Sequence, residues 1–267
     1  MPVDVEAKVL RNTRLSADYN IIALEAPEIA SLVAPGQFVM VKPGRGHDPL
    51  LRRPFSVFEI LRSHGHVEGL TLLSKRVGVT TRMLLEAVEG DIVSCLGPLG
   101  KPFEPVDPPA EAWMVAGGVG LAPFATLTEV LRQRGTETTL FYGARTGREL
   151  FHLDWFEARG VRLVLSTEDG TKGDRGRVTL PLERELKRGS GPVTVYACGP
   201  EPMLEAVAHL SSTYGRPSQV SVERVMGCGM GGCYSCVIAV RDPGGGHHYV
   251  RSCIGGPVFD GADLVWD

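Results

Sequence analysis

Four cysteines in the C-terminal third of the sequence have the spacing of an iron–sulfur site. They follow the pattern C-x4-C-x2-C, and the fourth comes after sixteen further residues: Cys228, Cys233, Cys236 and Cys253. Plant-type [2Fe–2S] clusters are held by such an arrangement, whereas common zinc sites use two C-x2-C pairs. Glycines between the cysteines let the backbone turn tightly and bring N–H groups close to the thiolates. We expect the four thiolates to ligate one [2Fe–2S] cluster; a zinc ion, a redox disulfide and unliganded thiols are the alternatives.

A glycine-rich turn in the middle of the sequence is typical of a dinucleotide site. Gly117, Gly118, Gly120 and Pro123 follow the apolar segment Trp113–Ala116 and open an expected helix. Glycines at such a turn let phosphate oxygens reach the N–H groups of the helix N-terminus. The spacing is G-G-x-G-x-x-P and differs from the strict G-x-G-x-x-G. We expect these residues to bind a nicotinamide dinucleotide; the alternative is a tight turn that serves only helix packing.

A second turn would bring a thiol to the same edge of the sheet. Cys198, Gly199 and Pro200 end what we expect to be the last parallel strand, Val193–Ala197. Ligands of open α/β folds bind at the carboxyl ends of the strands. We therefore assign these three residues to the nicotinamide site, with a small buried thiol as the alternative for Cys198.

An acidic turn, Glu168 and Asp169, follows the expected strand Val161–Ser166. A carboxylate there could bond a ribose hydroxyl and would repel a 2′-phosphate, which favours NADH over NADPH. Arg145, in a neighbouring turn, has the opposite preference because arginine can accept that phosphate. A solvated turn without a ligand is the alternative.

A short motif, Arg53, Pro54, Phe55 and Ser56, lies in a β-rich segment upstream of the dinucleotide turn. An arginine can clamp a pyrophosphate, and a serine hydroxyl can bond a flavin ring nitrogen. Because the motif is short, an edge strand with solvated arginines is the alternative. Its position ahead of a nucleotide-binding segment indicates a flavin site.

The elements that must position these groups divide into a barrel, an α/β domain and a lobe, so we expect a multi-domain fold. Residues 1–103 contain six short β-rich runs separated by proline and glycine, which indicates an all-β flavin-binding barrel. One helix is expected near Thr80–Val88. The runs are Val3–Val9, Ile21–Leu24, Gln37–Val41, Phe55–Ile60, Gly69–Ser74 and Ile92–Leu96.

A proline-rich linker, Lys101–Ala110, leads into strand–helix alternation over residues 110–218. This alternation predicts a parallel sheet with helices on its faces, and hence a nucleotide-binding α/β domain. Residues 219–267 would form the cysteine lobe, which at 49 residues is too short for an independent core. We expect the lobe to pack on the flavin barrel and to expose its other side to a partner.

Composition and charge exclude several classes of function. The 267 residues are 43% hydrophobic and carry a net charge of −3, so no nucleic-acid partner is indicated. The uncharged segment Ala112–Thr128 contains glycines and a proline, so a buried strand–turn–helix explains it better than a membrane span. The N-terminus has no signal-peptide pattern. We expect a cytoplasmic protein in which Cys95 and Cys198 are free thiols outside the cluster.

In this order the motifs resemble those of ferredoxin-reductase-like electron-transfer subunits, and most closely the iron–sulfur subunits of class 1B dihydroorotate dehydrogenases. The resemblance covers essentially the whole chain. It rests on Arg53-Pro54-Phe55-Ser56, Gly97-Pro98-Leu99-Gly100, the 117–123 turn, Cys198-Gly199-Pro200 and the four cysteines with Pro257. It implies an oxidoreductase of pyrimidine biosynthesis with FAD on the barrel and NAD(H) on the α/β domain. It also implies docking on an FMN-containing dihydroorotate dehydrogenase catalytic subunit in a heterotetramer.

The resemblance also assigns roles to individual residues. Arg53 would contact the FAD phosphates and Ser56 the isoalloxazine ring. Thr80 and Thr81 would stand at the pyrophosphate, where the family usually has Gly-Thr. Thr80 stands in place of the glycine and so departs from that pattern. A β-branched residue, unlike glycine, resists a positive φ. The flavin would be flanked by three residues of one strand, Leu73, Ser74 and Lys75.

The three cofactors have complementary chemistry. Hydride exchange with nicotinamide moves two electrons together and a [2Fe–2S] cluster takes one, so a flavin belongs between them. We expect no acid–base or nucleophilic catalytic residue in this chain, because the organic substrate would react in the partner. The loops Met226–Ser235 and Ser252–Phe259 would face that partner; the alternative is that Met230 and Tyr234 pack on the chain's own barrel.

Three other functions are compatible with the sequence. A self-contained reductase for an oxygenase usually carries a complete ferredoxin domain, with a longer gap before the fourth cysteine. Similar subunits serve hydrogenase, sulfide-reducing and ferredoxin-bifurcating complexes. A zinc-stabilised interaction module without redox function is the third alternative.

Overall fold

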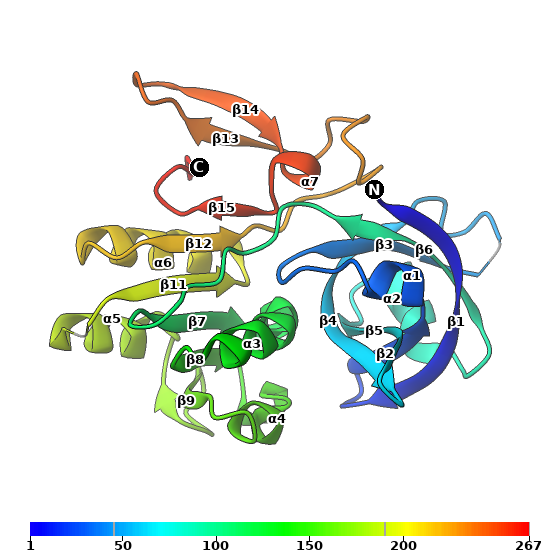
Figure 1. Cartoon of the computed structure of the whole chain (residues 1–267), viewed down its shortest axis with the longest axis horizontal. Helices are drawn as coiled ribbons and strands as arrows, with labels where there is room; N and C mark the ends of the chain where they lie inside the picture. The colour runs from blue at the N-terminus through cyan, green and yellow to red at the C-terminus, as the bar shows by residue number, and fades with distance from the viewer. Residues whose placement is uncertain (45, 190, 267) are drawn as a thin grey trace.

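The computed structural model describes residues 1–44, 46–189 and 191–266, and Asp267, the last residue of the expected lobe, lies outside these ranges. Figure 1 shows a barrel formed by the N-terminal part of the chain, a sheet flanked by helices, and a small lobe above that sheet. Among the described residues, no helix is both long enough and apolar enough to cross a membrane.

Antiparallel strands close the N-terminal barrel in the order β1-β2-β5-β4-β3-β6, which confirms the predicted architecture. Its interior consists of apolar side chains that alternate inward along each strand, such as the fully buried Val39, Val41 and Leu72. Two short helices, α1 (Pro27–Ala30) and α2 (Val79–Glu86), lie between strands. The strands are β1 (Val3–Arg14), β2 (Tyr19–Glu25), β3 (Phe38–Pro43), β4 (Arg53–Ser63), β5 (His66–Lys75) and β6 (Ile92–Leu99).

The barrel strands extend beyond the apolar runs that predicted them. Strand β1 was expected to end at Val9 but continues to Arg14, with Asn12 opposite Ile22 and Arg14 opposite Asn20. These last residues are polar and carry no hydrophobic alternation. Backbone hydrogen bonds to β2 and hydrogen bonds from the Asn12 side chain to the carbonyls of Leu84 and Ala87 therefore hold them in the strand.

A seven-stranded sheet in the order β10-β9-β8-β7-β11-β12-β15 forms the α/β domain. All its neighbours pair in parallel except β12 and β15, which are antiparallel. The expectation that β11 is the last parallel strand is wrong, because β12 follows it. Strand β12 has a single apolar residue, Val220, among serines and a glutamine, so its sequence contains no apolar run that predicts a strand. The strands are β7 (Glu111–Gly117), β8 (Thr138–Ala144), β9 (Arg162–Thr167), β10 (Asp174–Arg175), β11 (Val193–Cys198), β12 (Ser218–Ser221) and β15 (Val258–Asp260).

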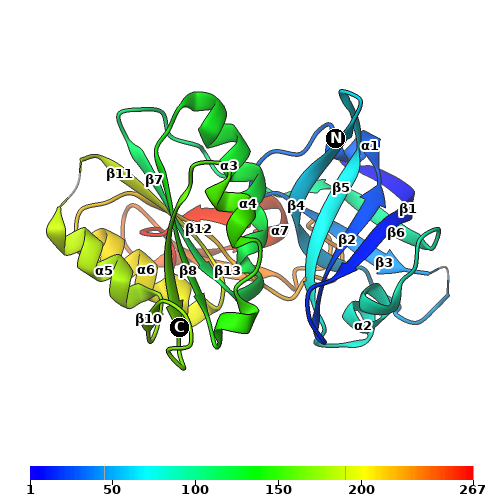
Figure 2. The ribbon, with the colours of Figure 1, turned by 90° about the horizontal axis from the view of Figure 1, so that it is seen from below.

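Helices cover both faces of this sheet, as predicted (Figure 2). Helices α3 (Ala122–Arg134) and α4 (Leu153–Glu157) lie on the face toward the barrel. Helices α5 (Thr179–Arg188) and α6 (Glu201–Thr213) lie on the opposite face. Two separate apolar cores, one beneath each pair of helices, hold the layers together.

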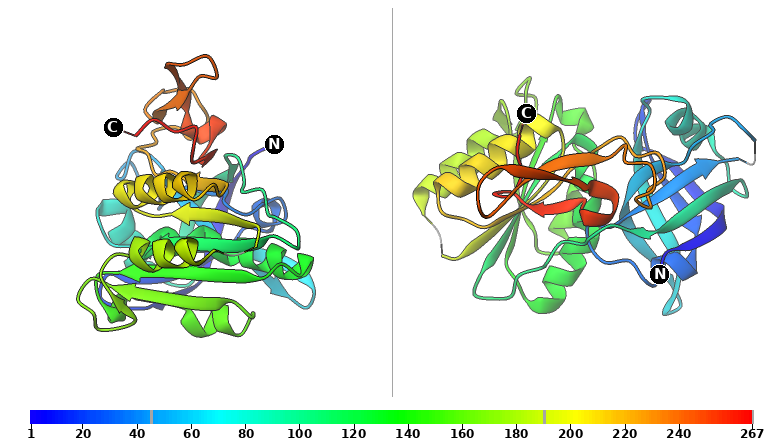
Figure 3. Two further views of the ribbon diagram at one scale, coloured as in Figure 1. Left: turned by 90° about the vertical axis from the view of Figure 1, so that its left-hand side faces the viewer. Right: turned by 90° about the horizontal axis from the view of Figure 1, so that it is seen from above.

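The C-terminal lobe consists of the hairpin β13 (Val237–Arg241) and β14 (His247–Arg251), the short helix α7 (Ser252–Gly255) and the cysteine-bearing loop before β13. Figure 3 shows the lobe standing on the β15 edge of the sheet, with the loop before β13 reaching toward the barrel. Strand β15 ties the lobe to β12 of the α/β domain. The lobe therefore packs on both other parts of the chain, whereas the sequence predicted only the barrel contact.

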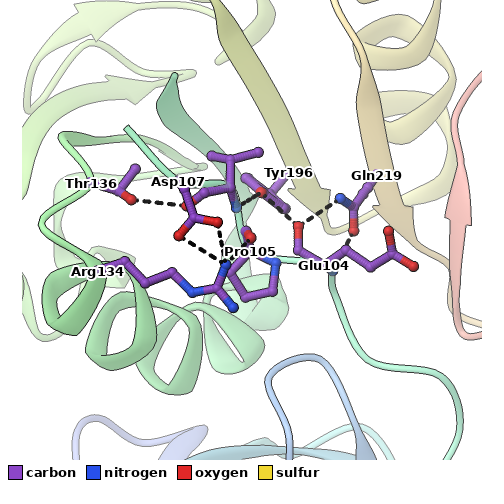
Figure 4. A network of polar contacts seen from close by, with 8 residues as sticks. Glu104, Pro105, Asp107, Arg134, Thr136, Tyr196 and Gln219 are labelled. Atoms are coloured by element: carbon purple, nitrogen blue, oxygen red, sulfur yellow. Dashed lines mark hydrogen bonds and ion pairs between the residues drawn. The ribbon is translucent and has the colours of Figure 1, made fainter. Parts of the chain in front are cut away.

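The proline-rich linker is held against the α/β domain by a network of polar contacts (Figure 4). The Tyr196 hydroxyl donates to the carbonyl of Glu104 at 2.9 Å and accepts the N–H of Val106 at 3.0 Å. Gln219 also binds both the N–H and the carbonyl of Glu104. Arg134 donates to the carbonyl of Pro105 at 2.5 Å. A linker with this many backbone contacts acts as a brace between the domains and is not a flexible tether.

Aromatic rings complete the contact between barrel and α/β domain. Phe103 stacks on Phe124 with ring centroids 5.9 Å apart, and Tyr19 lies 4.9 Å from Phe151. The ring of Phe58 on β4 meets that of His152 edge-on at 5.2 Å. Burial of several aromatic rings at one interface fixes the two domains in one arrangement.

Candidate cofactor sites

The four cysteines of the motif meet where the lobe contacts the barrel. Cys228, Cys233 and Cys236 lie in the loop before β13, and Cys253 lies in α7. Cys236 and Cys253 are buried in one apolar cluster with barrel residues that include Met40, whereas Cys233 is exposed. The structure therefore brings together all four residues that the sequence assigned to the site.

Two of these thiols have pKa values shifted in opposite directions by their surroundings. Hydrogen bonds from Ser235 and then from Cys228 lower the pKa of Cys233. Burial, and then the neighbouring thiol of Cys236, raises the pKa of Cys253. Four cysteine thiolates are the ligand set of a [2Fe–2S] cluster. Among the described residues, no three His, Cys, Asp or Glu side chains are placed to hold a single metal ion.

Glycine N–H groups point at these sulfurs, which is a second feature of an iron–sulfur site. The N–H of Gly232 donates to Cys228 Sγ at 3.2 Å, and the N–H of Gly231 is directed to the Cys253 sulfur. The loop can take this path only with glycines at its tightest points. At Gly229, where φ is +72°, a Cβ atom would lie 2.5 Å from Met40 Cγ. The residues present therefore fit a [2Fe–2S] cluster.

The remaining thiols, Cys95 and Cys198, lie elsewhere. Cys95 is in the barrel interior, and burial raises its pKa to about 12. Burial also raises the pKa of Cys198 to about 12, against a smaller opposing effect of a hydrogen bond with Ser221. Both are protonated thiols at neutral pH, and neither belongs to the cysteine site.

The Arg53–Ser56 motif forms the first four residues of strand β4. Ser56 lies opposite Phe38 and Arg53 opposite Val41 on β3. The Arg53 guanidinium is exposed and donates only to the neighbouring carbonyls of Leu51 and Arg52, at 3.4 and 3.1 Å. No described carboxylate pairs with it. Its charge is therefore available to an anionic ligand, while Pro54, Phe55 and Ser56 are half-buried beside it.

Arg52, the neighbouring arginine, has a structural role. Its guanidinium pairs with Asp4 at 2.7 Å and donates to Ser94 Oγ at 2.8 Å, which ties β4 to β1 and β6. The two arginines therefore do not form a solvated pair, because only one of them is free of an acidic partner.

The three residues expected to flank the flavin lie on β5, the strand next to β4. Leu73 packs into the core between the barrel and the α/β domain. Ser74 is also buried, and its hydroxyl has no hydrogen-bond partner among the described residues. Lys75 is half-buried, with its ammonium 5.0 Å above the ring of Tyr19. Of the three, Lys75 has the most solvent-accessible side chain.

The threonines of α2 serve the helix itself. Thr81 Oγ1 accepts the N–H groups of Val77 and Gly78, at 2.8 and 2.9 Å, and so caps the first turn. Thr80 is buried within the helix and has no positive φ, so a threonine fits this backbone where the family usually has glycine. Gly78, in extended backbone, precedes the helix.

The glycine-rich turn after β7 and the turn after β11 touch each other at the carboxyl edge of the sheet. A Cβ on Gly120 would lie 2.1 Å from the carbonyl oxygen of Cys198, and one on Gly117 would lie 2.8 Å from Pro200. Gly199 meets the backbone of Gly117 in the same way. Close packing therefore requires glycine at these positions, whatever ligand binds there.

Gly118 is different from these glycines. It has a φ of +55°, and a Cβ there would meet no atom within 4 Å. Space is therefore open above this residue, just before the N-terminus of α3, where Pro123 is buried in the first turn. Open space beside a helix N-terminus is what a phosphate group requires.

The acidic turn after β9 gives its two carboxylates different roles. Asp169 accepts the N–H and the hydroxyl of Thr171, at 3.0 and 2.7 Å, and these hydrogen bonds lower the pKa of Asp169. That carboxylate holds the turn together. Glu168 is exposed, so its carboxylate is the one available to a ligand.

A cavity of 470 Å³ opens at this edge, between the turns after β8 and β9. It contains two cations, Arg148 and Lys172, which sequence reasoning missed. Their position just beyond the carboxyl ends of two parallel strands was the only signal that could have identified them. The lining residues are Thr146, Gly147, Arg148, Asp169, Thr171 and Lys172.

Several apolar side chains of the lobe are exposed. The Met230 side chain is 58% exposed and the Tyr234 side chain is 62% exposed, so most of each is accessible to a partner. Contiguous exposed apolar residues mark interaction surfaces more often than they mark free surface. The others on the lobe are Val225, Val237, Tyr249 and Ile254.

Comparison with known proteins agrees with this geometry. Residues 223–265 match the iron–sulfur cluster binding domain of dihydroorotate dehydrogenase B, and residues 114–209 match the oxidoreductase NAD-binding domain. The dihydroorotate dehydrogenase B (NAD(+)) electron transfer subunit of Desulforamulus reducens is 35% identical, with 98% of each chain covered. The subunit of the same name from Geobacillus kaustophilus is 36% identical, with 97% of this chain and 98% of the relative covered.

Solved structures give the same result for the fold. A chain from the structure of an NADH-dependent reduced ferredoxin-NADP oxidoreductase, described in terms of flavin-based electron bifurcation, aligns with a TM-score of 0.85. It is 28% identical and covers 98% of this chain and 91% of its own length. The ferredoxin reductase of carbazole 1,9a-dioxygenase, at 21% identity and a TM-score of 0.69, covers 80% of this chain and 67% of its own length and shares the fold.

Proposed function

Because the chain belongs to the dihydroorotate dehydrogenase B electron transfer subunits, we propose that it passes electrons between NAD(H) and an FMN-containing dihydroorotate dehydrogenase catalytic subunit. FAD and a [2Fe–2S] cluster in this chain would connect the two. This function belongs to pyrimidine biosynthesis. No residue of this chain is assigned to chemistry on the organic substrate.

One observation carries this proposal: a single side chain joins the cysteine site to the flavin motif. Phe38 is the residue opposite Ser56 in the β3–β4 register. The same Phe38 is buried in one apolar cluster with Cys236 and Cys253. Two redox sites separated by one packed ring suit electron transfer, and an interaction module without redox function would not need that arrangement.

Each cofactor has a group of residues that would hold it. We assign the FAD phosphates to Arg53 and the flavin ring to Ser56 with Pro54 and Phe55, while β5 and the start of α2 flank them. We assign the cluster to the four cysteines and the nicotinamide dinucleotide to the turns after β7, β9 and β11. A bound flavin supplies the exchange between two-electron and one-electron carriers. The chain's own residues bind and orient the cofactors.

The division into domains follows these assignments. We propose a flavin barrel at residues 1–103, a nucleotide-binding domain at 110–218 and a cluster lobe at 219–267. Closure of the barrel by β6, which ends at Leu99, supports the first boundary. Residues 219–267 also contribute β15 and most of β12 to the seven-stranded sheet. The boundary at residue 219 therefore separates the proposed cofactor sites and does not separate two independently packed cores.

For the reductant we propose NADH. The free carboxylate of Glu168 disfavours a 2′-phosphate, while Arg148 and Lys172 in the neighbouring cavity act in the opposite direction. We also propose a cytoplasmic location, because the reaction uses NAD(H) and the cluster requires reduced thiolates.

The partner would dock on the lobe. Its exposed apolar side chains include Met230 and Tyr234 of the cysteine loop, and a heterotetramer of two copies of each subunit would cover them. A second candidate is a subunit of an electron-bifurcating complex, which the 28% identity and TM-score of 0.85 to the ferredoxin-NADP oxidoreductase chain favour. Both candidates use the same sites and differ only in the partner.

A reconstitution experiment tests this function. The isolated chain, loaded with FAD and cluster, should reduce artificial dyes with NADH at a higher kcat/KM than with NADPH, and it should not turn over dihydroorotate. Addition of the FMN-containing subunit should create dihydroorotate-to-NAD⁺ activity. Dihydroorotate oxidation by the lone chain would contradict the proposal, and equal kcat/KM for both reductants would contradict the choice of NADH.

The flavin assignment is tested by Arg53→Ala. We expect FAD affinity to fall by about tenfold to hundredfold, because one charge-assisted phosphate contact contributes roughly 1.5–3 kcal/mol. The measurement is flavin occupancy after dialysis against increasing volumes of buffer. Arg52→Ala is the matched control: it removes an adjacent guanidinium that is already paired with Asp4, so FAD retention should not change. Equal retention by the two variants would remove Arg53 from the site.

A further inference from the structure

One arginine of the lobe contacts the cysteine loop without belonging to any motif. Arg251 is the last residue of β14, two positions before Cys253. Its Nη1 donates to the carbonyl oxygen of Gly231 at 2.6 Å. Its guanidinium also lies over the ring of Tyr234, 4.6 Å from the centroid. Both partners lie between the first and third cysteines of the motif.

These contacts hold a strained loop in one shape. Gly231 has a φ of +81° and Tyr234 has a φ of +57°. A left-handed conformation at a residue with a side chain costs on the order of 1–3 kcal/mol, and surrounding contacts must over-determine it. Arg251 supplies one such contact to each residue: a hydrogen bond to Gly231 and a stacked cation on Tyr234.

The hydrogen bond to Gly231 also reaches a cluster ligand through one residue. The carbonyl of Gly231 accepts from Arg251, while the N–H of Gly231 is directed to the Cys253 sulfur. Hydrogen bonds to the sulfurs and the net charge around a cluster are the features by which a protein tunes its reduction potential. Arg251 therefore acts on both features.

The charge of Arg251 is not neutralised by any described carboxylate. Arg224, the other arginine of the lobe near the cysteines, pairs with both carboxylate oxygens of Glu201, at 2.6 and 2.8 Å. Reduction of the site by one electron adds one negative charge. An unpaired cation nearby stabilises that reduced form and so raises the reduction potential.

We propose that Arg251 is a positioning residue for the cluster: it fixes the Gly231 peptide against Cys253 and, by its unpaired charge, raises the cluster's reduction potential. The inference rests on the proposed function, because it presumes that the four cysteines hold a [2Fe–2S] cluster. It concerns a residue outside the cysteine, glycine and flavin motifs.

The test is a redox titration of the loaded full-length chain by electron paramagnetic resonance, with iron and acid-labile sulfide measured on each sample. In Arg251→Gln we expect the reduced-to-oxidised ratio at the wild-type midpoint to fall about tenfold, which is about 59 mV for a one-electron couple. A unit charge at roughly 10 Å, in a medium of effective dielectric constant about 20, has an effect of that size.

Two further variants separate charge from geometry. Arg251→Lys keeps the charge and loses the planar fork, so it should restore most of the midpoint shift. Arg241→Gln removes the same charge from the far end of the same hairpin, where Arg241 lies opposite His247 in the strand register. This variant should leave the midpoint unchanged. Loss of iron in Arg251→Gln but not in Arg251→Lys would also support the proposal, because it would show that the contact holds the loop.

Three results would count against it. An unshifted midpoint with normal iron content in Arg251→Gln would overturn the inference alone. Equal shifts in the Gln and Lys variants would overturn its electrostatic part. If the wild-type chain shows no [2Fe–2S] signal after reconstitution, the proposed function fails and the inference fails with it, so the two failures are distinguishable.

Discussion

Cys253→Ser is expected to remove the iron–sulfur signal from the reduced chain while FAD stays bound. Cys253 lies in α7 and is buried in one cluster with Cys236, whereas Cys95, a thiol outside the motif, lies in the barrel interior. A serine hydroxyl is a poor ligand for iron compared with thiolate. Iron and sulfide contents should fall strongly, and the paramagnetic resonance spectrum should be lost or strongly altered. Flavin content should be unchanged, because the residues that we propose for the flavin lie outside the lobe, on β4, β5 and α2.

Cys95→Ala provides the control for this experiment. Cys95 lies in the barrel interior, and the substitution by another small apolar residue should leave cluster loading at the wild-type level. Wild-type iron content and an unchanged spectrum in Cys253→Ser would mean that the fourth ligand has been misassigned.

Met230→Glu is expected to uncouple the chain from its partner while leaving its reduction of dyes by NADH intact. The Met230 side chain is 58% exposed, so a carboxylate there leaves folding and cofactor binding intact. At an apolar interface the same carboxylate would be buried without a counter-charge, which costs several kcal/mol. Dihydroorotate-to-NAD⁺ activity of the reconstituted complex should therefore fall by more than about tenfold at subunit concentrations near the wild-type Kd. Dye reduction with NADH should stay at the wild-type rate.

Leu180→Glu is a matched control, because Leu180 is 56% exposed on α5, a helix of the α/β domain outside the lobe. It introduces the same charge at similar exposure and should leave coupling intact. Full coupling in Met230→Glu, or equal losses in both variants, would show that this face of the lobe does not meet the partner.

The features that the sequence predicted correctly depend on local chemistry. Cysteine spacing is dictated by the ligands that a small inorganic core requires, so the sequence indicated a [2Fe–2S] cluster before any fold was known, while its four individual ligands stay a prediction. The barrel and the parallel sheet followed from apolar periodicity in strands such as β7 and β11. In each of these cases the information lies within a few residues of the chain.

The features that were missed depend on contacts between distant segments. Strand β12 has one apolar residue and exists because β11 and β15 lie on either side of it. Asp169 was one of two candidate acids, and only its two bonds from Thr171 show that it serves the turn. Arg148 and Lys172 lie 24 residues apart and share a cavity only because β8 and β9 are neighbours. No local sequence pattern predicts this strand pairing, these hydrogen bonds or this shared cavity.

Strand β15 links the position of Cys253 to the completion of the seven-stranded sheet. Cys253 and Val258 are separated only by the end of α7 and the short segment 256–257. In sequence order β15 is the final strand of the sheet, so during synthesis β12 has an unpaired edge until residues 258–260 arrive. An open edge strand is a template for pairing with other chains. Pairing of β15 with β12 closes that edge and, through the two-residue segment 256–257, also fixes the position of α7 and of Cys253 within it.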